Sequence, residues 1–172
     1  MDWQTRDEAR FIELDGRPVM RFIRYIDQPV EKVWAALTVP ERIADWLAPA
    51  EVELRLGGRY HVTWPGGTES GWRHVIRQLE PPYVLEIGSE DAPATRFELA
   101  AEGAGCRLAM TDFFPLRRPE GPEVLAGWHL LLDGLPAAVD GRPAVRHKDG
   151  EGLAGRLQEH YRARLSTERS IP

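Results

Sequence analysis

The period of the hydrophobic pattern changes several times along the chain, and the order of these changes limits the fold more than any other feature of the sequence. Residues 11–26 contain two runs rich in β-branched and aromatic residues, and apolar residues recur at helical spacing within 30–47. Apolar and polar residues then alternate within 50–114, and helical spacing returns within 120–139. Alternation is typical of strands with one buried face, whereas spacings of three and four are typical of amphipathic helices. This order predicts an α+β fold with an antiparallel sheet.

The first part of the chain predicts a strand pair followed by two short helices. Residues 11–14 and 19–26 are rich in β-branched and aromatic residues, and a tight turn joins them. A first helix is expected from Pro29 and a second from Pro40, because proline suits the first turn of a helix, and Pro49 ends the second one. The apolar faces of the two helices are Val30, Val33, Trp34 and Leu37, and Ile43, Trp46 and Leu47.

The middle of the chain predicts a meander of antiparallel strands. These strands are expected at 51–55, 59–64, 71–79, 83–87, 95–100 and 106–113. The run Pro65-Gly66-Gly67-Thr68 is a strong hairpin signal between the second and the third of them. The long helix predicted at 120–139 carries Leu125, Trp128, Leu132 and Leu135 on one side. We therefore expect a curved sheet with one face covered by this helix.

The register of the predicted hairpin decides which side chains face the long helix. If Gly66 and Gly67 form the turn, Tyr60 lies opposite Arg73. One face then carries Tyr60, Val62, Trp64, Arg73 and Val75, and the other carries His61, Thr63, Trp72 and His74. The first face is the more apolar and is predicted to face the helix, although a one-residue bulge would exchange the two faces.

In this register Arg73, and with it Arg77, points toward the interior. A buried guanidinium needs a carboxylate partner, and that partner is either a ligand carboxylate or an internal side chain, Asp112 or Glu98. Internal pairs commonly satisfy a buried arginine, whereas a ligand partner would make Arg73 a binding residue.

Three histidines are candidates for chemistry. His61 and His74 share a face in the predicted register, but no third ligand accompanies them, so we predict no metal site and interpret them as packing or solvated side chains. His129 follows Trp128 on the long helix, and a pair with Asp112 is the alternative in which it acts as a general acid or base. No phosphate-binding or dinucleotide-binding motif is present, so no cofactor is predicted and the catalytic residues stay unassigned.

Composition excludes several classes of protein. The net charge of −5 disfavours sequence-independent binding of nucleic acid. Cys106 is the only cysteine, which excludes an internal disulfide and a cysteine-based zinc site; we predict that it is a core residue, with a reactive thiol as the alternative. The polar N-terminus lacks the apolar core of a signal peptide, and no segment is long and apolar enough for a membrane span. We expect a cytoplasmic protein.

Segment 141–172 predicts a polar linker and an amphipathic helix that follow a domain at 1–140. The apolar stripe of this helix consists of Leu153, Leu157, Tyr161 and Leu165. An isolated helix of this length is marginal in water, so the stripe must dock on another surface. That surface is either the chain's own body, beside the short helices or on the outer sheet face carrying Trp72, or a second subunit, which would make a homodimer.

Four motifs in one order resemble a known family. They are 29–38 with 40–46 (PVEKVWAALT and PERIADW), 56–60 (LGGRY), 79–82 (LEPP), and 126–129 (AGWH) with Leu132-Asp133. Together they resemble proteins similar to the C-terminal domain of the heat-shock-protein-90 ATPase activator, within the START-like or SRPBCC superfamily that shares the helix-grip fold of the birch pollen allergen. The resemblance spans about residues 10–140. The chain departs from it at Asp112, where the family usually has histidine, and at Pro136, which is predicted to bend or end the helix.

The resemblance implies a sheet wrapped around a long C-terminal helix with an apolar cavity between them. Many relatives bind lipids, sterols, polyketides or other small hydrophobic molecules, so the predicted function is binding of a small hydrophobic ligand. The alternatives are an enzyme of the cyclase, dehydratase or hydrolase type acting in the same cavity, and a chaperone-interacting module. Within the family, chaperone activation belongs to longer proteins with an additional N-terminal domain, for which we expect no room in this chain. The predicted ligand-binding residues are Trp46, Tyr60, Trp64, Arg73, Phe97, Met110, Asp112, Trp128, His129 and Leu132.

Overall fold

The structure, a computed structural model, describes residues 8–65, 71–89, 93–115, 119–144 and 150–168. Its elements are β1 (Arg10–Leu14), β2 (Arg17–Ile26), α1 (Val30–Thr38), α2 (Pro40–Trp46), β3 (Ala50–Val52), β4 (Arg59–Thr63), β5 (Gly71–Glu80), β6 (Val84–Gly88), β7 (Thr95–Glu102), β8 (Gly105–Asp112), α3 (Gly121–Val139) and α4 (Gly150–Glu168). The elements follow the predicted order, and the predicted α+β class is confirmed. No helix among these residues is long and apolar enough to cross a membrane.

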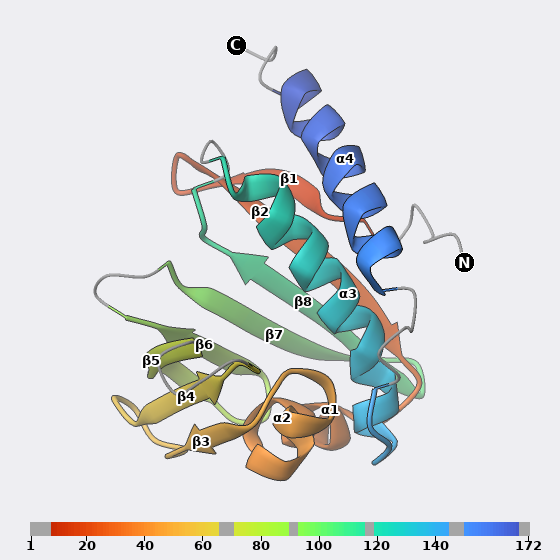
Figure 1. The fold of residues 1–172 in the computed structure, drawn as a ribbon. Helices are drawn as coiled ribbons and strands as arrows, with labels where there is room; N and C mark the ends of the chain where they lie inside the picture. Colours follow the sequence, from red (N-terminus) through yellow and green to blue (C-terminus); the bar gives the residue numbers. More distant parts are fainter. Residues whose placement is uncertain (1–7, 66–70, 90–92, 116–118, 145–149, 169–172) are drawn as a thin grey trace.

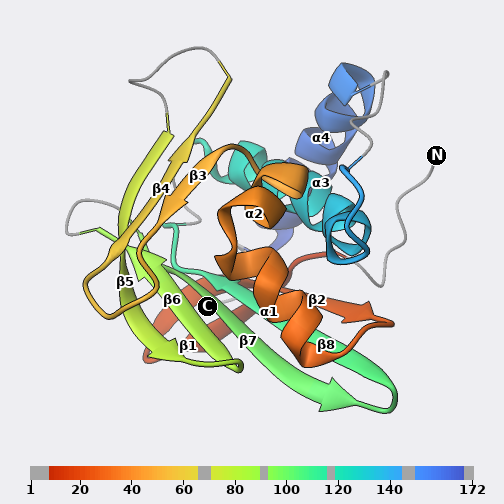
Figure 2. The ribbon, with the colours of Figure 1, turned by 90° about the horizontal axis from the view of Figure 1, so that it is seen from below.

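All eight strands form one antiparallel sheet in the order β1-β2-β8-β7-β6-β5-β4-β3. The sheet curves around α3, and α1 and α2 lie near one end of that helix (Figures 1 and 2). Each pair of adjacent strands in the sheet is also consecutive in sequence, except for β2 and β8. The pairing of β2 with β8 joins the N-terminal strands to the end of the meander. This is the predicted helix-grip fold.

The core lies between the sheet and α3. Side chains alternate along each strand, so β8 turns Cys106, Leu108 and Met110 inward, and Met110 pairs in register with Phe22 on β2 and Phe97 on β7. Burying a side chain of this size stabilises the fold by about 1.5–3 kcal/mol. Cys106 is buried, as predicted, and burial raises the pKa of its thiol.

One side-chain hydrogen bond joins the two short helices to each other, and a second joins α1 to the sheet. The Trp46 indole of α2 donates to the Ala36 carbonyl at 2.9 Å, and the Tyr60 hydroxyl of β4 donates to the Leu37 carbonyl at 2.9 Å. Both acceptors belong to the last turn of α1, where carbonyl groups have no partner within the helix. Thus Trp46 and Tyr60 join α1, α2 and β4, and burial raises the pKa of the Tyr60 phenol.

The predicted register of the β4–β5 hairpin is wrong by one residue. Tyr60 pairs with His74 and His61 with Arg73, so the face toward α3 carries His74 while Arg73 is exposed on the outer face. The predicted turn residues Gly66 and Gly67 lie outside the described residues. Because side chains alternate, a shift by one position in the pairing exchanges the two faces of β5 while leaving those of β4 unchanged.

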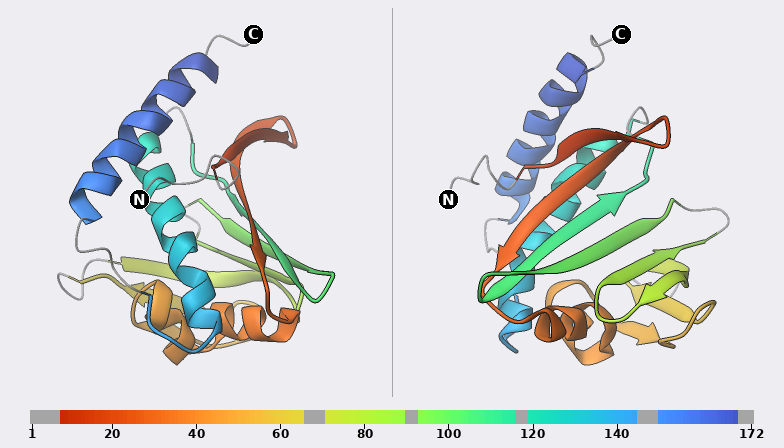
Figure 3. Two further views of the ribbon diagram at one scale, coloured as in Figure 1. Left: turned by 90° about the vertical axis from the view of Figure 1, so that its right-hand side faces the viewer. Right: turned by 180° about the vertical axis from the view of Figure 1, so that it is seen from behind.

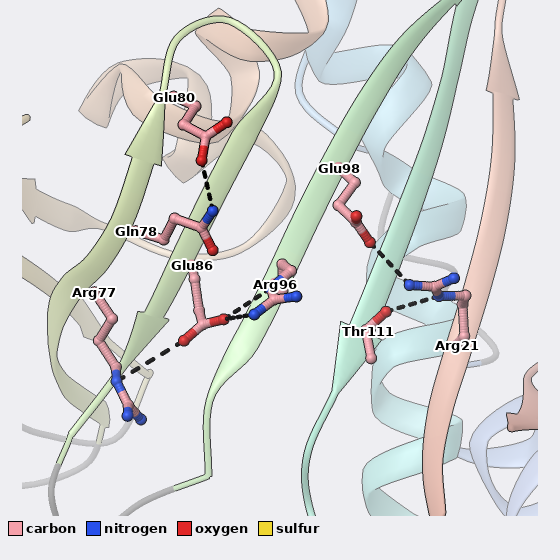
Figure 4. Close-up of polar contacts among 8 residues, drawn as sticks. All are labelled: Arg21, Arg77, Gln78, Glu80, Glu86, Arg96, Glu98 and Thr111. Carbon is pink, nitrogen blue, oxygen red and sulfur yellow. Dashed lines mark hydrogen bonds and ion pairs between the residues drawn. The ribbon is translucent and has the colours of Figure 1, made fainter. Parts of the chain in front are cut away.

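The outer face of the sheet carries ion pairs that cross from strand to strand (Figure 4). Glu86 on β6 accepts from Arg96 on β7 and lies 3.8 Å from Arg77 on β5. Glu98 on β7 accepts from Arg21 on β2 at 2.9 Å. Arg77 was predicted to point inward, and Glu98 was one of two candidate internal partners. The structure places both on the outer face, where solvent-screened pairs add little stability.

The C-terminal helix packs on α3, on the side of α3 away from the sheet (Figure 3). Leu157 and Tyr161 are fully buried there, and Leu165 is 8% exposed. Glu8 beside the first strand bridges to His160 and Arg164, with Nε2–Oε1 at 3.0 Å and Nη1–Oε2 at 3.2 Å. Thus α4 packs on α3, and not beside the short helices or on the outer sheet face, the two docking sites on the chain itself that the sequence suggested. Trp72, which was expected on that outer face, points into the interior.

The helix α3 continues past Pro136 to Val139. Proline there removes one amide donor from the helical hydrogen-bond ladder. The residue lies in the last turn, where the Asp140 amide donates to its carbonyl at 3.2 Å. The loss of one donor is therefore confined to the end of the helix.

Candidate functional site

A pocket of about 610 Å³ lies between the sheet and the N-terminal half of α3. It is lined by Trp64, Trp72, His74, Pro93, Thr95, Asp112, Phe114, Val124, Gly127, Trp128, Leu130 and Leu131. The wall is mainly apolar with a few polar groups, which is the usual composition of small-molecule sites. The polar groups come from β5, β7 and the end of β8, so the sheet supplies them and the helix supplies mostly apolar surface.

Three tryptophans form a continuous aromatic wall. The ring of Trp72 lies 5.3 Å from that of Trp64, edge to face, and 5.4 Å from that of Trp128, tilted by 37°. Phe97 supports Trp128 from the core with its centroid 6.2 Å away. Contacts of this kind contribute about 0.5–1.5 kcal/mol each beyond burial. The wall joins β4, β5 and α3, and its rings hold one another in place.

His74 is the polar group of β5 that faces the pocket. Its ring stacks on Trp72, two residues earlier on the same face, with centroids 5.2 Å apart and planes within 6°. The side chain is buried, and its Nδ1 has no hydrogen-bond partner among the described residues. Burial, together with the nearby His61, lowers the pKa of His74 to about 4. The imidazole is therefore neutral at physiological pH.

Asp112, at the end of β8, is the second polar group of the pocket. Its Oδ1 accepts from the Phe114 amide at 2.8 Å, and its Oδ2 accepts from the Thr95 hydroxyl at 3.0 Å and the Trp128 indole at 2.8 Å. Burial raises the pKa of this carboxyl, and the three donors oppose that rise. The hydrogen bond from the Trp128 indole to Asp112 fixes the orientation of the Trp128 ring at the pocket wall.

Only part of the predicted site lines the pocket. Trp64, Asp112 and Trp128 are on its wall. Five other predicted residues belong to the hydrophobic core behind it, namely Trp46, Tyr60, Phe97, Met110 and Leu132. Arg73, predicted to point inward, is on the outer face of the sheet.

The pair of His129 and Asp112, which the sequence left open as an alternative, is not formed among the described contacts of the two residues. His129 lies on the side of α3 that meets α4, where its Nδ1 is 2.7 Å from the Tyr161 hydroxyl and its Nε2 is 3.6 Å from Asp133. Asp133 in turn accepts from Arg24 of β2 at 2.9 Å. The side chain of His129 is buried in this network, away from the pocket, because adjacent helical residues project about 100° apart.

Most of the pocket wall consists of residues that were not predicted from the sequence. The missed residues are Trp72, His74, Pro93, Thr95, Phe114, Val124, Gly127, Leu130 and Leu131. Trp72 and His74 were noticed but assigned to the outer face, and a register shifted by one residue would have placed both inside. No metal-binding group of histidine, cysteine or acidic side chains occurs in the described part of the chain, and His61 and His74 lie on opposite faces.

Comparison with a family model places the chain among known proteins. Residues 27–140 match the family described as activator of Hsp90 ATPase homolog 1-like protein. The chain belongs to this family. The match covers α1 to α3 and all strands between them, so the resemblance predicted from the sequence motifs is confirmed. No curated protein sequence matches the chain.

Solved structures share the fold over most of the chain. EF2215 from Enterococcus faecalis, a conserved protein of unknown function, is 17% identical with a TM-score of 0.75, covering 92% of this chain and 91% of that chain. CalU16 from Micromonospora echinospora is 26% identical with a TM-score of 0.68, covering 92% and 94%. DynU16, a protein in the dynemicin biosynthetic locus, is 23% identical with a TM-score of 0.63, covering 72% of this chain and 48% of that chain.

Proposed function

We propose that this protein binds a small hydrophobic molecule of lipid or polyketide type in the pocket between the sheet and α3. The observation that carries the proposal is the pocket of about 610 Å³ with an aromatic wall and two buried polar groups. Small-molecule sites in proteins typically have volumes of about 300–1,000 Å³ and a mainly apolar lining with a few polar groups. The shared fold with DynU16, a protein in the dynemicin biosynthetic locus, is compatible with a ligand-binding role.

Binding is favoured over catalysis by the way the polar groups are used. Both carboxylate oxygens of Asp112 already accept hydrogen bonds, from Phe114, Thr95 and Trp128. In the described part of the chain no hydrogen bond joins it to His74, so the pocket lacks an assembled acid–base pair. An enzyme of the cyclase, dehydratase or hydrolase type remains the alternative, acting through His74 alone.

Gly127 offers a test that fills the pocket without removing a core side chain. This residue lines the pocket from α3, and a Cβ added there meets nothing within 4 Å. Gly127→Leu should reduce the affinity for the neutral fluorescent probe N-phenyl-1-naphthylamine about tenfold or more, because the new side chain occupies the volume of the ligand. The helix itself should gain stability, since leucine is a better helix former than glycine.

The matched control is Gly155→Leu in α4, at an exposed position with equally open surroundings. It makes the same change away from the pocket and should leave probe affinity unchanged. Equal probe binding by Gly127→Leu and the control, or no binding by the wild-type protein, would refute the proposal. Native mass spectrometry of the freshly purified protein would add a direct search for a co-purifying ligand.

A further inference from the structure

Resting on the proposed function, we infer that the ligand is an uncharged aromatic molecule with a carbonyl oxygen, and that His74 Nε2 donates a hydrogen bond to this oxygen. Three features of the pocket lead to this ligand class: its lack of cationic side chains among the described lining residues, the environment of the His74 ring, and the flat rings of the wall. Each feature excludes a different kind of ligand.

The charge of the pocket excludes anionic ligands. No lysine or arginine is among the described residues on its wall, and its one acidic side chain, Asp112, provides no positive charge. The nearest described strands turn Arg73 and Arg96 to the outer face of the sheet. A carboxylate ligand would therefore lose its water without gaining a counter-charge, which is unfavourable in a largely apolar site. A fatty acid with its headgroup inside is the wrong ligand for this pocket.

The environment of His74 selects a hydrogen-bond acceptor. Nδ1 is buried and has no hydrogen-bond partner among the described residues, whereas the ring lines the pocket, so Nε2 is the nitrogen that a ligand can reach. A neutral imidazole carries one proton, and a buried N–H without an acceptor costs more than a bare nitrogen in the same place. The proton therefore belongs on Nε2, where it faces the pocket as a donor. The lowered pKa of His74 agrees with a neutral ring.

The shape of the wall selects an aromatic body. Trp72 stacks on His74 and contacts Trp64 and Trp128, so the donor at Nε2 is held beside a set of fixed rings. A planar ligand can contact these rings while its carbonyl oxygen meets the donor. Because the stack fixes the plane of the imidazole, the donor is oriented before the ligand arrives, which favours binding.

Three naphthalene probes of similar size separate these contributions. They are 2-acetonaphthone, which has a neutral carbonyl, 2-ethylnaphthalene, which has no acceptor, and 2-naphthoate, which is anionic at pH 7. Their affinities for the full chain can be measured by quenching of tryptophan fluorescence at pH 7. We expect 2-acetonaphthone to bind about five- to tenfold more tightly than 2-ethylnaphthalene, from one added hydrogen bond. We expect 2-naphthoate to bind more than tenfold more weakly than 2-acetonaphthone.

The variant His74→Phe keeps an aromatic ring against Trp72 and removes the donor. It should abolish the preference for 2-acetonaphthone over 2-ethylnaphthalene, and this ratio between the two affinities is the readout whatever the variant does to each affinity alone. His61→Phe, on the opposite face of the sheet, is the control and should keep the preference.

The outcomes separate this inference from the proposed function. If 2-ethylnaphthalene binds but 2-acetonaphthone gains nothing over it, or if 2-naphthoate binds best, the inference is overturned and the pocket is still a ligand site. If none of the three probes binds the wild-type protein, both are overturned. The comparison among probes on the wild-type chain decides this even if His74→Phe fails to fold.

Discussion

The hydroxyl of Tyr161 joins the C-terminal helix to two other parts of the molecule, and its removal tests how that helix is held. The oxygen accepts from the Ala9 amide at 3.2 Å and lies 2.7 Å from Nδ1 of His129. Nε2 of His129 lies 3.6 Å from the Asp133 carboxylate, which favours a proton on that nitrogen, and we therefore assign the tyrosine hydroxyl as the donor to Nδ1. The side chain is fully buried, and burial raises the pKa of its phenol.

Tyr161→Phe keeps the packed ring and leaves two buried groups, the Ala9 amide and His129 Nδ1, without this partner. Each unsatisfied buried group costs about 1–3 kcal/mol. Because local rearrangement recovers part of this loss, we expect the free energy of unfolding to fall by about 2–4 kcal/mol. The matched control is Tyr25→Phe, since Tyr25 is 67% exposed and its change should stay within about 0.5 kcal/mol.

The measurement is urea unfolding followed by tryptophan fluorescence and by far-ultraviolet circular dichroism. Coincident transitions with an unchanged slope would allow the two variants to be compared directly. A loss in Tyr161→Phe no greater than that in Tyr25→Phe would refute the assignment of this hydroxyl as an anchor of α4. Faster hydrogen exchange at the Ala9 amide is a second expected sign, because that amide loses its acceptor.

Two further predictions concern β5. Gly71→Ala should destabilise the protein by about 2–4 kcal/mol in the same assay, since Gly71 has φ +143° and an added Cβ would meet the Val62 carbonyl oxygen. The control Gly155→Ala has open space around the added Cβ and should change stability by less than about 1 kcal/mol. Similar stability changes for the two variants would contradict this prediction. The free energy of unfolding should fall at acid pH because of His74, whose pKa decreases from 6.5 in the unfolded chain to about 4 in the folded protein. The contribution of the neutral imidazole to this free energy is complete above pH 6.5 and is lost progressively as the pH falls toward 4. His74→Phe should therefore lose less stability than the wild type between pH 7 and pH 4, and parallel losses would show that His74 does not titrate this way.

Local sequence patterns determined the elements and most of their faces. Alternation placed Met110 and Phe97 on the inner face of the sheet, although both were predicted to line the cavity and lie in the core instead. Helical spacing placed Trp128 against the sheet, because both periods follow from backbone geometry within one element. Cys106 was also placed correctly, since it alternates with buried residues on β8. The order of the elements, together with four short motifs, was enough to predict the helix-grip fold.

The tertiary structure alone decided which side chains line the pocket. The register of β4 and β5 depends on the connection between them and on packing against α3, and a shift of one residue exchanged Arg73 for His74 on the inner face. The face of α3 that carries His129 was likewise undecided in the sequence, because α3 is covered by the sheet on one side and by α4 on another, and both contacts demand buried residues. Periodicity tells which residues of an element share a face, but only the packing of one element on another tells what that face meets.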